Sequence, residues 1–208
     1  MRPHGPEILT LDAARPESST LDKAATVLRH GGLVAFPTET FYGLGAAALD
    51  AHAAGRIFEV KARPQDKPLL VLVDSAEMAE SLVDEVPVSA RRLMTRYWPG
   101  PLTLVLRARA TVPRAITAGT GTIGVRVSSH PVAQGLVRAL GAPVTAPSAN
   151  PGGAPPPTLA AQVVEYFGGA LALVLDSGPT AGGPASTVLD LTVEPARVIR
   201  QGAVRVSA

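Results

Sequence analysis

The chain has 208 residues, of which 46% are hydrophobic and 17% are charged, so it can form one domain with a substantial apolar core. Its formal net charge of +2 excludes a strongly basic protein, and any contact with nucleic acid requires a local patch. The absence of cysteine excludes disulfides, thiolate catalysis and metal sites with cysteine ligands, and it is typical of a cytoplasmic protein.

Residues 1–17 lack both a signal-peptide pattern and a strong hydrophobic period, so we expect a tail or an edge strand there, followed by the main domain over residues 18–208. Apolar residues on one helical face predict a first helix over 20–30, which a glycine ends. An apolar run predicts a buried strand over 33–36, and Pro37 ends it because proline cannot donate a hydrogen bond to a sheet. No apolar run in the chain reaches the ~20 residues of a membrane helix.

The polar residues after this strand are the first candidate site. Thr38, Glu39 and Thr40 lie just past a strand end, where many α/β folds bind their ligands. The same residue types are typical of a capped turn that leads into a helix. The stretch alone does not decide between a binding site and a capped turn.

Capping residues and hydrophobic spacing predict most of the remaining elements. Helices are expected after Asp50, after Ser75, over 89–97, from Pro131 to Leu140 and from Thr158 to Phe167. Strands are expected over 69–73, 102–106, 123–127, 144–146, 171–175, 187–191 and 197–199. Because strands and helices intermix without a repeat or a linker, we predict a single α/β domain in which helices flank one twisted mixed β-sheet of about seven strands.

A basic cluster of Lys61, Arg63 and Lys67 is the second candidate site. A proline follows both Arg63 and Lys67, so the backbone between a helix end and a buried strand is stiff. Three cations within seven positions can neutralise a triphosphate, arginine through a bidentate fork and lysine as a point charge. The alternative is a solvated helix C-terminus, where cations interact favourably with the helix dipole by about 0.3–1 kcal/mol.

Glycine-rich and hydroxyl-rich segments lie at further strand ends. Residues 119–124 match G-x-G-x-x-G, but they precede a strand instead of following one, so we reject a dinucleotide-binding loop. Their backbone, together with Thr122 and Arg126, can still hold an anion. Ser148 and Asn150 follow a short strand, where a plain Asn-Pro turn is the alternative.

Ser186 and Thr187 place two more hydroxyls at the start of a late strand, and Arg200 stands at the end of the last strand. Hydroxyl or amide groups therefore lie at four strand ends, with Arg or Lys beside three of them. The sequence has no P-loop, and its histidines are too scattered to suggest a metal site. This combination favours a site that positions anions and stabilises charge, as transfer at phosphorus requires.

Six motifs occur in a fixed order along the chain. They are Pro37–Gly45, Lys61-x-Arg63-Pro64 with Pro68, Trp98-Pro99-Gly100-Pro101-x-Thr103, Gly124-Val125-Arg126-Val127, Ser148-Ala149-Asn150 and Ser186-Thr187-Val188. In this order they resemble the YrdC family, the threonylcarbamoyl-AMP synthases, from Leu21 to Val204. The resemblance implies a twisted α/β sheet around a large basic cavity, and a short single-domain type without an additional C-terminal domain.

The resemblance implies an enzyme, a nucleotidyltransferase that makes threonylcarbamoyl-AMP and pyrophosphate from L-threonine, bicarbonate and ATP. Mg²⁺ would accompany the ATP. The product would serve the formation of threonylcarbamoyladenosine in tRNA. Downstream threonylcarbamoyl-transferase proteins would be partners in the cytoplasm, a contact with tRNA is allowed, and no membrane is involved.

The resemblance also implies residue roles, position by position. The catalytic residues would be Lys61 and Arg63. Threonine would contact Thr40, Arg126, Ala146 and Ser186, and ATP would contact Arg63, Lys67, Thr122, Ser148, Asn150 and Arg200. Some relatives carry a histidine where this chain has Leu72, and some carry a serine where it has Pro156, so the detailed contacts at these two positions are open.

Two other functions stay open beside this one. A non-catalytic RNA-binding module of the same fold would need aromatic residues beside basic ones on a sheet, but the one Trp, three Tyr and four Phe are scattered. A carbamoyl transferase of the hydrogenase-maturation type would carry zinc-finger cysteines, which this chain lacks. The role of Glu39 is also open, because it can either hold the turn after the first strand or pair with a neighbouring cation.

Overall fold

The computed structural model describes residues 5–206, so the first four residues of the predicted N-terminal segment and the last two of the main domain lie outside it. Its strands are β1 (Glu7–Thr10), β2 (Val34–Pro37), β3 (Tyr42–Gly45), β4 (Leu70–Leu72), β5 (Leu102–Arg107), β6 (Thr122–Arg126), β7 (Val144–Thr145), β8 (Leu173–Asp176), β9 (Thr187–Asp190) and β10 (Arg197–Arg200). Its helices are α1 (Ser18–Arg29), α2 (Ala51–Lys61), α3 (Ala76–Leu82), α4 (Val88–Tyr97), α5 (Arg114–Thr117), α6 (Pro131–Leu140), α7 (Ala160–Phe167) and the short 3₁₀ helix η1 (Gly168–Ala170). The predicted α/β class is confirmed.

The strands form two mixed sheets instead of the one sheet expected. The four-stranded sheet has the order β1-β8-β2-β3, and the six-stranded sheet has the order β10-β9-β5-β6-β4-β7. β8 is parallel to both of its neighbours, whereas β3 returns antiparallel beside β2. The division was missed because hydrophobic period predicts that a strand exists but not which distant strand pairs with it.

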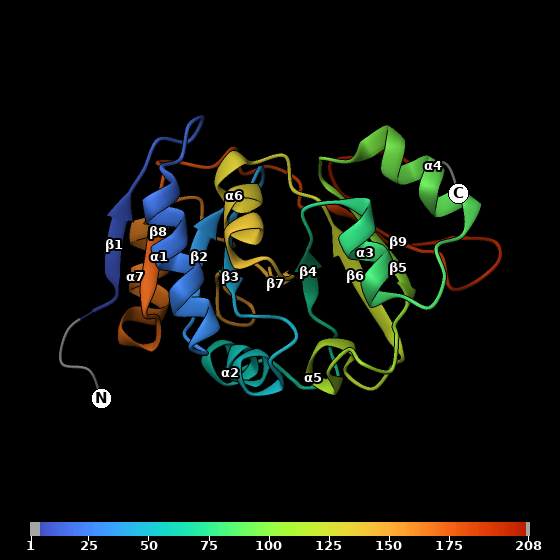
Figure 1. The fold of residues 1–208 in the computed structure, drawn as a ribbon, viewed down its shortest axis with the longest axis horizontal. Helices are drawn as coiled ribbons and strands as arrows, with labels where there is room; N and C mark the ends of the chain where they lie inside the picture. Colours follow the sequence, from blue (N-terminus) through green and yellow to red (C-terminus); the bar gives the residue numbers. More distant parts are fainter. Residues whose placement is uncertain (1–4, 207–208) are drawn as a thin grey trace.

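Three helices cover the two faces of the four-stranded sheet (Figure 1). Along β8, Leu173 and Leu175 pack with Leu28 of α1 and with α6, whereas Val174 points to the other face and packs with Phe167 of α7. This alternation follows from the period of two in a strand. Burying each such side chain contributes about 1.5–3 kcal/mol to stability, so both faces of this sheet are well anchored.

The two sheets meet at a seam between β3 and β7. The Thr145 hydroxyl donates a hydrogen bond to the backbone oxygen of Leu44 at 3.0 Å and accepts one from the amide of Ala46 at 2.9 Å. The Thr145 amide in turn donates to the backbone oxygen of Ala46 at 3.0 Å. Thr145 is fully buried, so these bonds are sheltered from water and hold the sheets side by side.

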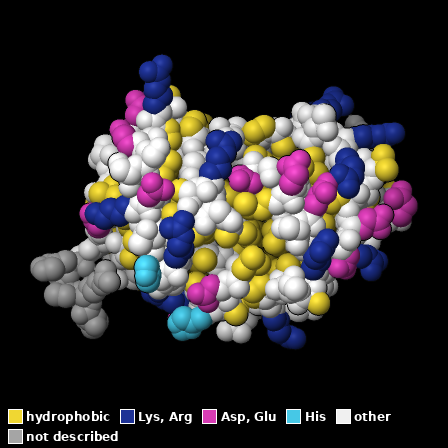
Figure 2. All heavy atoms as spheres, in the orientation of Figure 1, with side chains coloured by type: hydrophobic (Ala, Val, Ile, Leu, Met, Phe, Trp, Pro, Cys, Tyr) yellow, Lys and Arg dark blue, Asp and Glu magenta, His cyan; other side chains and the backbone are white. Residues whose placement is uncertain are grey.

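Charged side chains of both signs are interspersed over the face of the molecule shown in Figure 2, in agreement with the small net charge. Hydrophobic side chains gather on this face in a band between the two halves of the molecule. None of the helices between residues 5 and 206 is both long enough and apolar enough to cross a membrane.

Most predicted elements are present, with ends shifted by a few residues. Both predicted caps are confirmed, because the Asp50 carboxylate accepts hydrogen bonds at the start of α2 and the Ser75 hydroxyl accepts one at the start of α3. The short helix α5 and the strand β3 were not predicted. The residues after Pro37 turn back into β3, so of the two alternatives for this stretch the capped turn leading into a helix is wrong.

β3 escaped prediction because two of its four residues are glycines, which weaken any strand pattern. The structure shows why side chains are excluded there. A Cβ atom on Gly45 would lie 2.8 Å from the Phe36 ring and 3.0 Å from the backbone oxygen of Val34. The strand therefore packs closely against β2, and the hairpin that results forms one wall of the site described next.

Candidate active site

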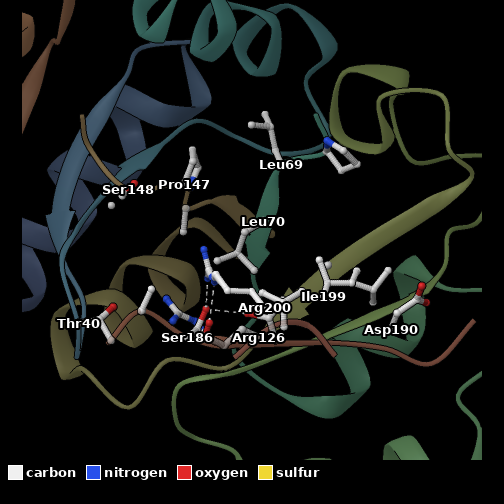
Figure 3. Close-up of a pocket in the computed structure, with 18 of the residues that line it drawn as sticks. Thr40, Leu69, Leu70, Arg126, Pro147, Ser148, Ser186, Asp190, Ile199 and Arg200 are labelled. Carbon is white, nitrogen blue, oxygen red and sulfur yellow. Dashed lines mark hydrogen bonds between the residues drawn. The ribbon is translucent and has the colours of Figure 1, made fainter. Parts of the chain in front are cut away.

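A cavity of about 680 Å³ lies between the two sheets (Figure 3). Its walls come from the β2–β3 hairpin, from residues 146–148 after β7, and from the strands of the six-stranded sheet. Among the described residues, the charged side chains that line it are Arg63, Arg126, Arg197, Arg200 and Asp190. Arginine outnumbers carboxylate, so the cavity is basic, as the family resemblance implied.

Most of the predicted site residues line this cavity. They are Thr40, Arg63, Thr122, Arg126, Ala146, Ser148, Ser186 and Arg200. The remaining three, Lys61, Lys67 and Asn150, are not among its lining residues. Of the two positions at which this chain departs from some relatives, Pro156 lines the cavity, whereas Leu72 is buried in the core beneath α1 and α6.

The hairpin turn presents one threonine to the cavity and uses another to hold its shape. The Thr38 hydroxyl donates to the backbone oxygen of Phe41 at 2.7 Å and accepts from the amides of Thr40 and Phe41 at 3.3 Å each. The polar backbone groups of the turn therefore find hydrogen-bond partners within the turn itself. The Thr40 hydroxyl, 3.3 Å from that of Thr38, is then available to a ligand in the cavity.

Arg126 is the most deeply buried charge in the cavity wall, with only 3% of its side chain exposed. Burial lowers its pKa and Glu39 raises it, and arginine stays protonated in such surroundings. Its guanidinium donates no hydrogen bond to any residue between 5 and 206. Glu39, 3.5 Å away, is its ion-pair partner, so of the two roles expected for this carboxylate the structure shows the pairing with a cation.

Ser186 and Arg200 form a second polar group beside Arg126 (Figure 3). Nε of Arg200 donates to the backbone oxygen of Ser186 at 3.0 Å, and Nη2 donates to its hydroxyl at 2.9 Å. The Thr103 hydroxyl lies 3.1 Å from the same Ser186 hydroxyl. Burial and the nearby positive charge of Arg126 lower the pKa of Arg200. Two guanidinium groups thus face one space, which favours an anion between them.

Arg63 stiffens the loop that the sequence predicted to be rigid. Its Nη2 donates to the backbone oxygen of Pro68 at 3.1 Å, and its Nε approaches that of Lys67 at 3.4 Å. Burial lowers the pKa of Arg63, and Asp66 raises it. Lys67 itself is exposed and is not among the residues that line the cavity. Of the predicted basic cluster, only Arg63 reaches the cavity.

Lys61 is buried behind the cavity wall, with 4% of the residue exposed, so a solvated helix end is wrong for this residue. Its ammonium donates to the backbone oxygens of Ser148 and Asn150, and its own backbone oxygen accepts from the amide of Gly152 at 3.2 Å. The Asn150 side-chain amide donates to the backbone oxygen of Ala154 at 2.7 Å. Lys61 and Asn150 therefore shape the loop whose Ser148 lines the cavity.

The burial of Lys61 gives a testable pH dependence. Burial, with a smaller contribution from Arg63, lowers its pKa from 10.5 to about 8, so the unfolded chain binds a proton that the folded chain lacks between these values. The free energy of unfolding of the wild type should therefore rise with pH across this window, relative to that of Lys61→Met. Denaturant titrations of both proteins at several pH values check this, and a constant difference would contradict it.

Asp190 and Arg197 line the outer part of the cavity and were not predicted. Asp190 accepts hydrogen bonds from Thr192, and from Arg197 at 2.9 Å. Burial raises the pKa of Asp190, but these hydrogen bonds outweigh it and hold the pKa below its ordinary value. The only signal in the sequence was an acidic residue at the end of a strand.

Comparison with known proteins agrees with this geometry. The model of the Sua5/YciO/YrdC family, described as "Telomere recombination", matches residues 26–202. The chain is 50% identical to the threonylcarbamoyl-AMP synthase of Pyrococcus abyssi over 86% of this chain and 53% of that one, and 44% identical to that of Bacillus subtilis over 88% and 53%. The structure of P. abyssi Sua5 complexed with L-threonine superposes with a TM-score of 0.91 at 47% identity, over 94% of this chain and 57% of that one.

This chain spans about half the length of these relatives. The family match nevertheless covers most of its residues, including every position that lines the cavity. The resemblance noted in the ordered motifs is therefore confirmed, and the chain belongs to the Sua5/YciO/YrdC family.

Proposed function

We propose that this chain is an L-threonylcarbamoyladenylate synthase, a nucleotidyltransferase that converts L-threonine, bicarbonate and ATP into threonylcarbamoyl-AMP and pyrophosphate. The observation that carries the proposal is Arg126, a buried guanidinium in the cavity wall whose hydrogen bonds are unused by the residues described. Such an arginine is suited to bind the carboxylate of an amino acid through a bidentate contact. The similarity to P. abyssi Sua5, whose structure is complexed with L-threonine, supports this choice of amino acid.

In the proposed reaction the carboxylate of threonine binds Arg126, and Thr40 and Ser186 contact the rest of the amino acid. The amine attacks the carbon of bicarbonate and water leaves, which gives a carbamate. A carbamate oxygen then attacks the α-phosphorus of ATP, and the bond to the bridging oxygen breaks to release pyrophosphate. Arg63 and Arg200 stabilise the negative charge that develops on the phosphates.

We propose that Mg²⁺ enters bound to the phosphates of ATP. The described residues contain no cluster of three or more His, Asp or Glu side chains that could hold a metal. The carboxylate in the cavity lining, Asp190, already accepts hydrogen bonds on both oxygens. Mg²⁺ bound through substrate phosphates and few protein groups fits this donor set. The product would pass in the cytoplasm to threonylcarbamoyl-transferase proteins that modify tRNA.

The proposal is tested by incubating the protein with labelled bicarbonate, L-threonine, Mg²⁺ and ATP. Threonylcarbamoyl-AMP and pyrophosphate should form in equal amounts and only when all substrates are present. Absence of both products with folded protein would refute the enzyme proposal. Binding of RNA without product would favour the non-catalytic alternative instead.

Replacing Arg63 by alanine should lower the turnover by at least about tenfold, because a cation beside the phosphates is lost. The melting temperature should change little, since within residues 5–206 the Arg63 side chain donates hydrogen bonds only to two backbone oxygens of its own loop. Steady-state rates at varied ATP, together with thermal unfolding, measure both effects. Arg92→Ala, which removes an exposed arginine of α4, is the matched control. A rate equal to that of the wild type would exclude Arg63 from the chemistry.

A further inference from the structure

Glu39 and Arg126 form a buried ion pair. The proposed reaction uses the guanidinium of Arg126 but gives the carboxylate of Glu39 no direct role. Oε1 of Glu39 lies 3.5 Å from Nη1 of Arg126, and the two side chains are 14% and 3% exposed. Within the described range, Oε1 of Glu39 and Nε of Arg126 have no hydrogen-bond partner, and solvent does not reach them. In a buried pair with this geometry, the attraction between the charges offsets little of the free energy lost when both charges are removed from water. Stability alone is therefore a poor explanation for it.

Glu39 is held in place from the start of α6. The Ser128 hydroxyl donates to Oε2 of Glu39 and accepts from the amide of His130, the residue that caps α6. The side-chain amide of Gln134 donates to the backbone oxygen of Ser128 at 2.7 Å. One carboxylate oxygen is thus fixed by a helix terminus, and the other is directed at Arg126.

Glu39 and Arg126 are placed differently relative to the cavity. Arg126 lines the cavity and Glu39 does not, so the carboxylate contacts the guanidinium from behind the wall. In front of the wall, Arg200 faces the same space as Arg126 (Figure 3), and the two positive charges repel each other. A fixed carboxylate behind Arg126 offsets this repulsion without occupying the space of a ligand.

We propose that Glu39 is a positioning residue, which is held by Ser128 and fixes the Arg126 guanidinium through their ion pair, so that N–H groups of the guanidinium face the cavity. This inference rests on the proposed function, because the ligand of Arg126 would be the carboxylate of L-threonine. A guanidinium that is already fixed loses little freedom on binding, so the affinity for threonine rises although Glu39 does not touch it. The affinity for ATP, which would contact other side chains, rises less.

The first test replaces Glu39 by glutamine, which keeps the size of the side chain and an acceptor for Ser128 but removes the charge. KM and Kd for L-threonine should rise tenfold or more, while kcat and KM for ATP should each change less than twofold. Calorimetric titration with L-threonine alone gives Kd, and initial rates give the other constants. Glu80→Gln is the control, because it removes an exposed carboxylate that pairs with Arg91 and should leave every constant unchanged.

A second variant covers the case in which Glu39→Gln fails to fold. Ser128→Ala keeps both charges and removes the hydroxyl that holds Glu39 and also accepts from the amide of His130. KM for L-threonine should rise about threefold to tenfold with kcat unchanged, less than in Glu39→Gln because the charge of Glu39 is retained. A merely structural pair would lower the melting temperature of both variants and leave KM for L-threonine unchanged. That result, or an equal loss for threonine and ATP, would overturn the proposal.

A third measurement separates this inference from the proposed function. If the wild type binds no L-threonine, the proposed function fails, and the nitrogen–proton NMR signal of Arg126 Nε then tests the positioning without any substrate. The signal should broaden or shift in Glu39→Gln and stay unchanged in Glu80→Gln. An Arg126 signal that is the same in Glu39→Gln and the wild type would overturn the inference, whatever the ligand is.

Discussion

Arg126→Lys should lower kcat/KM for L-threonine by about a hundredfold, with a smaller effect on KM for ATP. Lysine keeps a positive charge opposite Glu39 but replaces the planar fork by a single point charge, so the bidentate contact to a carboxylate is lost. A hydrogen bond to a charged group contributes about 1.5–3 kcal/mol, and losing one such bond corresponds to a factor of about ten to over a hundred. The upper part of this range applies because Arg126 is almost entirely buried.

Initial rates at varied L-threonine and saturating ATP measure this effect. The matched control is Arg138→Lys, which makes the same replacement on the exposed side of α6 and should behave like the wild type. Thermal unfolding of both variants checks that the fold is kept. If Arg126→Lys retained the kcat/KM of the wild type, Arg126 would not bind the amino acid and the proposed function would lose its main support.

Gly202→Ala should lower the free energy of unfolding by about 3 kcal/mol and reduce activity as well. A Cβ atom on Gly202 would lie 2.1 Å from the backbone oxygen of Ala185 and 2.6 Å from the backbone nitrogen of Thr187. Neither side can move easily, because the Gly202 amide donates to the Thr187 hydroxyl at 3.0 Å. Displacing this segment would also pull Arg200 away from Ser186 in the cavity.

Denaturant titration and initial rates of Gly202→Ala measure the two effects. Gly55→Ala is the control, because in the middle of α2 the added Cβ would meet no atom within 4 Å apart from its chain neighbours and the backbone of its own helix. There the same replacement should raise stability by up to about 1 kcal/mol, since alanine is favoured over glycine in a helix. Unchanged stability of Gly202→Ala would mean that the segment after β10 adjusts without strain.

Most helices and strands could be predicted because their signals are local. Asp50 and Ser75 cap helices through hydrogen bonds to amides two or three residues away, and apolar runs such as residues 102–106 become buried strands. The division into two sheets could not be predicted, because it depends on β8 pairing with β1 and β2 across most of the chain. Local period carries no information on such pairing.

The site could be predicted in part, because some of its signals are local in the sequence and others depend on contacts between distant segments. Hydroxyls at strand ends, such as Thr40 and Ser186, do line one cavity, and the ordered motifs led to the right family. The burial of Lys61 could not be foreseen, because a cation in the last turn of a helix is usually solvated and its partners lie in a distant loop. The pairing of Glu39 with Arg126 likewise depends on how β6 meets the hairpin.

The central place of β8 in the four-stranded sheet has a consequence for synthesis on the ribosome. β1 emerges before the other strands of its sheet, but β8, its partner, begins only at Leu173. Chains are made from the N-terminus at about 5–20 residues per second, so β1 remains unpaired for many seconds before β8 is made. β9 and β10, which complete the cavity, emerge later still. The nascent chain therefore exposes an unfinished sheet edge until β8 has emerged, which is the interval in which a chaperone can act on it.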